Sequence, residues 1–267
     1  MKLMPVRKLG RLTSPHDSRQ LYLRRYLMPG LAAPPEECDW SGAVDAAFKS
    51  QGIEEWPVYA NDEYGCCVEA AACHAIISWT ANGSGFFLPS YDQCLEAYSA
   101  ITGFMRGDYG TDKGTDPIDC LKYWRGVGVA DHTIGAWVEV SATNVQEIKQ
   151  AIYLFGACYM GLDLPLAAAE FKIWHVPTWP FDWGDSRPGS WGGQMVMADA
   201  YDKHGVTVTT WGERKYVTWP FIGRYGAGLY AVLSQDILRP NGLAPAGIDF
   251  DALRANLEAV GNSPHTP

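Results

Sequence analysis

The sequence lacks the features that would assign it to a membrane, disulfide-bonded or zinc-binding class. No apolar run approaches the 18 residues of a membrane-spanning helix, and the first residues lack the apolar core of a secretory signal. Seven cysteines is an odd number, so we expect free thiols in a reducing cytoplasm. Cys66, Cys67, Cys73 and His74 share one segment, but no second cluster completes a tetrahedral site, and we predict no cofactor and no metal.

Charge is distributed unevenly along the chain. The formal net charge is −9, yet the first 25 residues carry seven basic residues against the single acid Asp17. This segment could lie on the protein's own acidic surface, on a protein partner or near nucleic acid, and a solvated tail is an equal alternative. The acidic remainder has no basic-aromatic patch, which argues against a nucleic-acid reader in the globular part.

The most informative stretch begins at Asn61 and leads into Cys67. A polar loop containing Gly65 precedes the cysteine, and from Val68 the apolar residues recur at helical spacing, so Cys67 should stand at a helix N-terminus. Unpaired N–H groups and the helix dipole favour a thiolate there, and the thiolate is the nucleophilic form. Packing is the alternative role of a free cysteine, and we assign it to Cys73, Cys94, Cys120 and Cys158.

Helical patterns dominate the first half of the chain after this stretch. Ser90 and Gln93 form a capping box before one helix, and Asp116-Pro117 opens another. A further helix is expected at about 144–155, where apolar residues recur on one face.

Strand patterns dominate the second half. Alternating residues at 158–164 predict a half-buried strand, and short strands at hairpin spacing follow at 195–201, 206–211, 216–219 and 228–234. Helices first and an antiparallel sheet afterwards predict an α+β arrangement in two lobes.

The Cys67 loop resembles the nucleophile loop of papain-like cysteine peptidases. Asn61 falls where that family keeps its oxyanion-hole Gln, Gly65 on the loop glycine and Cys67 on the nucleophile. Cys66 takes the place of the small residue before the nucleophile, and Val68 replaces the aromatic residue after it. The resemblance implies a two-lobe α+β fold with the cleft between a helical lobe and an antiparallel β lobe.

The second half of such a site would come from residues 192–212. Gln194 occupies the position of the family's histidine, and Thr209 occupies that of its asparagine. The run from about 7 to 234 is similar to papain-like proteins of tailed bacteriophages and some actinobacteria, which pair Asn-Asp-x-x-Gly-x-Cys with Gly-Gly-His and Val-Thr-Trp-Gly. The positions kept here are Asn61, Asp62, Gly65, Cys67, Gly192, Gly193, Val208, Thr210, Trp211, Gly212, Thr218, Trp219 and Phe221.

The departure at Gln194 removes the proton acceptor from the site. An amide can donate a hydrogen bond to a thiolate, but it cannot accept and return a proton near neutral pH. Loss of general acid–base catalysis costs on the order of 10²–10⁴ in rate. Of the other histidines, only His175, in a tryptophan-rich loop at 171–191, is placed to substitute. Further cleft or lid candidates are Cys66, Trp191, Gly193 and Trp211.

The residues therefore favour a catalytically impaired papain-like scaffold over a working enzyme. The leading hypothesis is a bacteriophage protein that binds other polypeptides and serves as a virion structural component, made in the cytoplasm of the producing cell. The alternative is an active thiol peptidase or amidase that cuts protein or cell-wall peptide through Cys67. In either case Cys67 should begin a long helix and face Gln194, with Asn61 nearby.

The chain divides into three predicted regions. Residues 1–38 form an extended basic arm that avoids the core and contacts partner proteins. Residues 39–238 form the papain-like domain, mainly helical over 39–156 and mainly β over 157–238. Residues 239–267 form a tail with a short helix.

Overall fold

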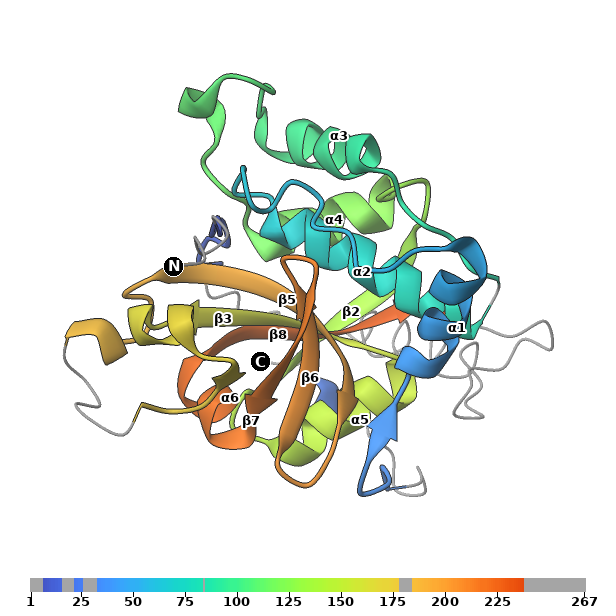
Figure 1. Cartoon of the computed structure of the whole chain (residues 1–267), viewed down its shortest axis with the longest axis vertical. Helices are drawn as coiled ribbons and strands as arrows, with labels where there is room; N and C mark the ends of the chain where they lie inside the picture. The colour runs from blue at the N-terminus through green and yellow to red at the C-terminus, as the bar shows by residue number, and fades with distance from the viewer. Residues whose placement is uncertain (1–6, 16–21, 26–32, 84, 178–183, 238–267) are drawn as a thin grey trace, which may run out of the picture.

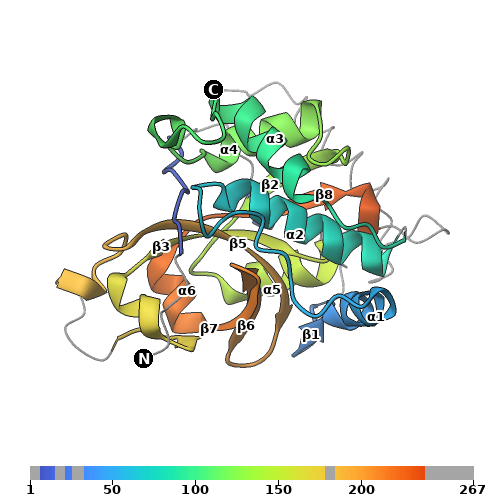
Figure 2. The ribbon, with the colours of Figure 1, turned by 45° about the horizontal axis from the view of Figure 1, so that its top comes forward.

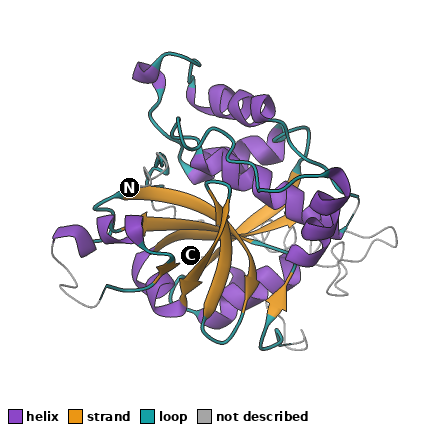
Figure 3. Ribbon diagram, viewed as in Figure 1, coloured by secondary structure: helices purple, strands orange, loops and turns teal. Residues whose placement is uncertain are grey.

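The computed structural model of the chain describes residues 7–15, 22–25, 33–83, 85–177 and 184–237. The short helix predicted within 239–267 lies outside the described residues. Over the described ranges, the helices near the N-terminus group together on one side of a large sheet (Figure 3).

The helical lobe is built around α2, which begins at Cys67 as predicted. From Cys67 to Thr80 every residue of this helix is buried. Figure 2 shows the reason, because α2 lies between the sheet below it and two further helices above. The helices of this lobe are α1 (Ser41–Gln51), α2 (Cys67–Asn82), α3 (Tyr91–Thr102) and α4 (Pro117–Gly126).

The predicted helix starts are confirmed by their capping bonds. The Ser90 side chain accepts from the Gln93 backbone N–H, and the Gln93 side chain accepts from the Ser90 N–H, which completes the capping box of α3. Asp116 caps α4 by accepting from Ile118 N–H at 2.9 Å. Asn144 caps α5 (Val145–Phe155) in the same way.

The second half of the chain forms most of one mixed, largely antiparallel sheet. Its strand order is β2-β8-β3-β5-β6-β7-β4 (Figure 1). In this path only the pairing of β4 with β7 is parallel. The remaining strand, β1, lies off the path and pairs with β5. The strands are β1 (Cys38–Asp39), β2 (Ile134–Val140), β3 (Cys158–Leu164), β4 (Ile173–Trp174), β5 (Gly192–Tyr201), β6 (Gly205–Thr210), β7 (Glu213–Thr218) and β8 (Gly226–Ser234). A short helix, α6 (Trp219–Tyr225), precedes β8. No described helix is long and apolar enough to cross a membrane.

Two strand predictions need correction. β3 was expected to be half-buried, but all its residues except Asp163 are buried, because β5 and β8 flank it and helices contact both sides of the sheet. β2 was not predicted, because its exposure pattern does not alternate and its register shifts near Gly135.

The prediction that residues 1–38 avoid the core is wrong at Leu23. This side chain is 1% exposed and belongs to the main hydrophobic core. It begins a 3₁₀ turn (Leu23–Arg25) that contacts β2 and α5. The turn adds an apolar anchor to a segment whose charge alone had suggested a surface arm.

Candidate active site

Cys67 is the first residue of α2 and is fully buried. Its Sγ accepts a hydrogen bond from the Met195 backbone N–H at 3.4 Å. That contact joins the start of α2 to β5, the strand that carries Gln194. The two distant halves of the predicted site therefore meet.

The Cys67 thiol is not the easily ionised group that its helix-terminal position predicted. The pKa of Cys67 is raised to about 12. Burial is the main cause and the nearby Glu69 carboxylate adds to it, while the backbone hydrogen bonds of Met195 and Gly10 act in the opposite direction. Desolvation disfavours the anion more strongly than two donors favour it. The thiol is therefore protonated at neutral pH.

Gln194 stands beside the site and is held by two hydrogen bonds. Its Nε2 donates to Asn61 Oδ1 at 2.8 Å and to Thr210 Oγ1 at 3.0 Å, and its side chain is fully buried. Asn61 in turn donates through Nδ2 to the Tyr64 carbonyl at 3.2 Å. Asn61 and Gln194 are thus brought together as the sequence predicted, in a network without an imidazole.

The predicted partner Thr209 does not contact Gln194. The side chains of successive residues in a strand point to opposite faces of the sheet, so only one of Thr209 and Thr210 can face Gln194 on β5. Thr210 does so, and Thr209 Oγ1 instead accepts from Arg214 at 3.2 Å. The Thr209 assignment was wrong by one residue.

The described histidines outside the site all have contacts elsewhere. His175 is exposed and packs against Phe171, with ring centroids 4.5 Å apart. His74 is buried, its Nε2 lies 2.7 Å from the Pro57 carbonyl, and burial lowers its pKa to about 4. His204 lies at the β5–β6 turn. His132 Nδ1 lies 2.9 Å from Asp236 Oδ1. None of these four described histidines is bonded to Cys67.

The other cleft candidates have different positions. Cys66 is buried in a cluster with Tyr64 and Tyr98, and its thiol donates to the Tyr59 carbonyl at 3.2 Å, so it packs rather than lines a site. Trp191 packs against Trp211 with ring centroids 5.6 Å apart.

A feature that the sequence did not reveal is the course of residues 7–12, which we call the strap. The strap crosses the site between the helical lobe and the sheet, and it is part of the dark blue trace in Figure 2. Lys8 N–H donates to the Asn61 carbonyl at 3.1 Å. Two side chains, Asn61 Nδ2 and Trp211 Nε1, donate to the Lys8 carbonyl at 3.2 and 3.1 Å.

The strap also bonds to both walls of the site through its main chain. Gly10 and Arg11 N–H donate to the Gly193 carbonyl at 3.2 and 3.0 Å. On the other side, Thr115 N–H donates to the Gly10 carbonyl at 2.8 Å, and Leu12 N–H donates to the Thr115 carbonyl at 2.9 Å. Arg11 and Thr115 pair in parallel orientation. The strap is thus an extra segment of extended chain inserted beside Cys67.

Each basic side chain of the strap faces a carboxylate. The ion pairs are Arg7 with Glu213 at 3.1 Å, Lys8 with Asp112 at 3.4 Å, and Arg11 with Asp163. Arg7, Lys8 and Arg11 therefore lie on the protein's own acidic surface, which is one of the locations considered for the basic segment.

Glu69 is a second feature that the sequence did not single out. It is fully buried on α2, and among the described residues neither carboxylate oxygen has a hydrogen-bond partner. Burial raises the pKa of Glu69 to about 7. No group of three or more possible metal ligands is present in the described ranges.

Comparison with known proteins identifies the architecture. No family model and no curated protein sequence matches this chain. Xylellain, a cysteine protease from Xylella fastidiosa, superposes with a TM-score of 0.64 at 14% identity, covering 88% of this chain and 98% of that one. This chain has the papain-like cysteine protease fold. Procathepsin B S9 from Trypanosoma congolense gives 0.58 at 12% identity, over 87% and 88% of the two chains. Procathepsin L2 from the larval midgut of Tenebrio molitor gives 0.54 at 13%, over 86% and 79%.

Proposed function

We propose that this protein is a catalytically impaired papain-like scaffold that binds other polypeptides. The observation that carries the proposal is Gln194, which is buried and bonded to Asn61 and Thr210, and which precedes the residue whose N–H donates to Cys67. Thiol-dependent hydrolysis requires a group that takes the thiol proton and returns it to the leaving amine. An amide side chain performs neither transfer near neutral pH.

The surroundings of the thiol support the same proposal. Burial keeps Cys67 protonated, and the strap lies against it with the donor of Asn61 already engaged by the Lys8 carbonyl. Asn61 is the residue that the family resemblance assigns to stabilising an oxyanion. With that donor occupied and an amide side chain at position 194, the capacity that remains to the site is to hold extended polypeptide.

The biological setting follows from the resemblance to papain-like proteins of tailed bacteriophages. We place the protein in the cytoplasm of the producing cell and then in the phage particle, as a virion component that contacts other virion polypeptides. Copurification with intact particles tests this setting. Its absence from purified particles would contradict a structural role.

A turnover assay tests the loss of catalysis. The full chain, Cys67→Ala and Gln194→His are incubated with a broad peptide library and read by mass spectrometry. We expect no turnover by the first two and partial activity at most from Gln194→His, because the Thr210 hydroxyl and the Asn61 amide oxygen both bond to the side chain at position 194 and would compete to orient the imidazole. Turnover by the unmodified chain that disappears in Cys67→Ala would instead establish the thiol peptidase or amidase alternative.

A further inference from the structure

Glu69 stands two residues after Cys67, in the first turn of α2. Its side chain is fully buried, and among the described residues neither carboxylate oxygen has a hydrogen-bond partner. Buried polar groups are nearly always paired, so an unpaired carboxylate beside a candidate nucleophile calls for a physical explanation.

The N-terminus of α2 attracts negative charge, and two acidic side chains share it. The positive end of a helix dipole amounts to roughly half an elementary charge, and its effect fades within the first turn. It therefore stabilises one anion far better than two. Cys67 and Glu69 both lie within this turn, so they compete for the same stabilisation.

The other titratable side chains around Glu69 are weak acids that stay neutral at pH 7. They are Tyr98 from α3, Cys120 from α4 and Tyr159 from β3. Burial raises the pKa of all three, and the Glu69 charge adds to it. Burial raises the pKa of Glu69 only to about 7, whereas that of Cys67 is raised to about 12. Glu69 is therefore the first of these groups to ionise as the pH rises.

Glu69 acts on Cys67 through its charge and not through a bond. Residues two apart on a helix do not face each other. The Cys67 thiol is turned toward β5, where the Met195 N–H donates to Sγ at 3.4 Å. Its other near neighbours are the Gly10 backbone and the Cys66 side chain. A carboxylate placed in this way does not take the thiol proton directly, but in a buried site it opposes a second negative charge.

We propose that Glu69 holds Cys67 in its neutral thiol form by taking the single negative charge that the N-terminus of α2 stabilises. Two residues then impair the site in different ways. Gln194 replaces the proton acceptor, and Glu69 suppresses the thiolate that the helix terminus would otherwise favour. This inference rests on the proposed function, because it supplies a second cause for the loss of nucleophilic chemistry.

Removing the Glu69 charge should make Cys67 easier to ionise. An interaction of about one pKa unit between two buried charges in the same helical turn changes the ionised fraction about tenfold. In Glu69→Gln we therefore expect the thiolate fraction of Cys67 at pH 10 to rise about tenfold over wild type. Glu69→Asp keeps the charge and changes the packing, so its thiolate fraction should stay close to that of wild type.

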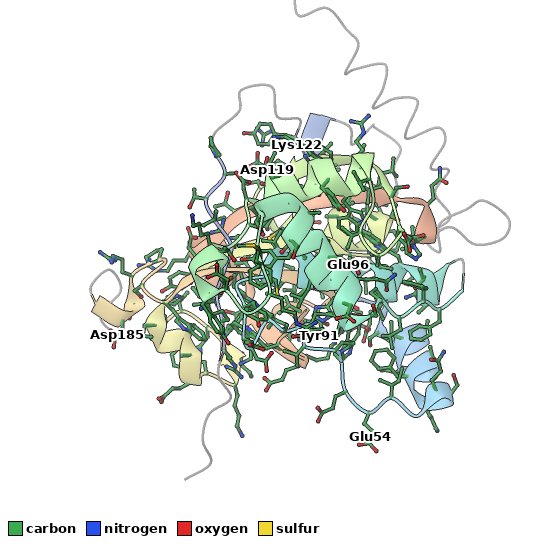
Figure 4. The ribbon with its side chains drawn as sticks, turned by 90° about the horizontal axis from the view of Figure 1, so that it is seen from above. Glu54, Tyr91, Glu96, Asp119, Lys122 and Asp185 are labelled. Atoms are coloured by element: carbon green, nitrogen blue, oxygen red, sulfur yellow. The ribbon has the colours of Figure 1, made fainter. Side chains whose placement is uncertain are left out.

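The experiment reads the ionisation of the thiol itself. The full chain carries ¹³C at every cysteine Cβ, and the Cβ chemical shift of Cys67 is followed from pH 7 to pH 10 in each variant, with Cys67→Ser for assignment. Cys158 is the internal control, because burial raises its pKa to about 12 and Glu69 is not among the groups that shift it. Glu96→Gln is the matched control variant, since Glu96 is an exposed carboxylate on α3 (Figure 4).

Three results would overturn the proposal. The first is the same Cys67 titration in wild type and Glu69→Gln. The second is a change in Glu69→Gln that Cys158 shares, and the third is a change that Glu69→Asp reproduces, because both would come from loosened packing and not from charge. If Glu69→Gln does not fold, Glu69→Met removes the same charge and is judged by the same criteria.

Failure of this inference is distinguishable from failure of the proposed function. If the Cys67 titration ignores Glu69→Gln, Glu69 does not hold the thiol neutral, and Gln194 alone accounts for the impaired site. Cys67-dependent turnover by the unmodified chain would instead contradict the proposed function, and the titration of Cys67 in Glu69→Gln would still decide the role of Glu69.

Discussion

Gln194 Nε2 donates to Asn61 Oδ1 at 2.8 Å, which joins a residue of β5 to one that precedes α2. The bond lies close to Cys67, because the backbone N–H of the next residue, Met195, donates to the Cys67 thiol. It also orients Asn61, whose amide donates to the Lys8 carbonyl of the strap. One buried amide pair therefore connects the two lobes and the strap.

We predict that Asn61 and Gln194 are energetically coupled. Asn61→Ala leaves buried polar groups unpaired and should lower the free energy of unfolding by about 1–3 kcal/mol. The double variant with Gln194→Ala should cost less than the sum of the single variants by roughly 0.5–3 kcal/mol. Urea unfolding of the four proteins measures the coupling. Gln146 is exposed, so the effects of Asn61→Ala and Gln146→Ala are expected to add, and this pair is the control. If the effects of Asn61→Ala and Gln194→Ala also add, the two residues are not energetically coupled.

Glu69 should make stability depend on pH between about 4.5 and 7. The unfolded carboxyl ionises near 4.5, whereas the folded one keeps its proton up to about 7. The folded state then binds more protons, so the free energy of unfolding falls as pH rises through this window, by up to about 3 kcal/mol. In Glu69→Gln this part of the fall should disappear.

The measurement is the melting temperature of wild type and Glu69→Gln at pH 5 and 7.5. Glu96→Gln, at an exposed position of α3, is expected to keep the wild-type slope. An identical slope in wild type and Glu69→Gln would contradict the assignment of a raised pKa to Glu69.

Leu23 should anchor the N-terminal region to the core. Because its side chain is 1% exposed, Leu23→Ala is expected to lower the free energy of unfolding by about 2–5 kcal/mol. Leu166 is the matched control, since it also lies in a 3₁₀ turn but is 44% exposed, and its alanine variant should stay within about 0.5 kcal/mol of wild type. Equal effects of the two substitutions would mean that Leu23 does not pack as described.

The parts of the fold that the sequence predicted are those with local signals. The capping box at Ser90, the Asp116 cap and the start of α2 at Cys67 depend on residues within a few positions of one another. The pairing of the Cys67 and Gln194 segments came from the family resemblance. The predicted division into three regions stays a prediction.

The strap could not be predicted because its partners are distant in sequence. Gly10 bonds to Gly193 and Thr115, and no local period marks such contacts. The sequence showed the basic residues of this segment, but it did not distinguish between the protein's own surface, a protein partner and nucleic acid as the place where they bind. The Thr209 error has a similar origin, because the face of each β6 residue is fixed by its pairing with β5, a strand that is distant from Cys67 in the sequence.

Alkylation of Cys67 across pH tests the central claim most directly. The full chain is treated with iodoacetamide from pH 5 to 9.5, and modification of Cys67 is quantified by mass spectrometry, with Cys67→Ser as the blank. Because burial raises the pKa of this thiol to about 12, we predict almost no modification at neutral pH and a slow rise only at the alkaline end. Rapid modification with a midpoint well below pH 7 would identify an activated nucleophile and contradict the account of an impaired site.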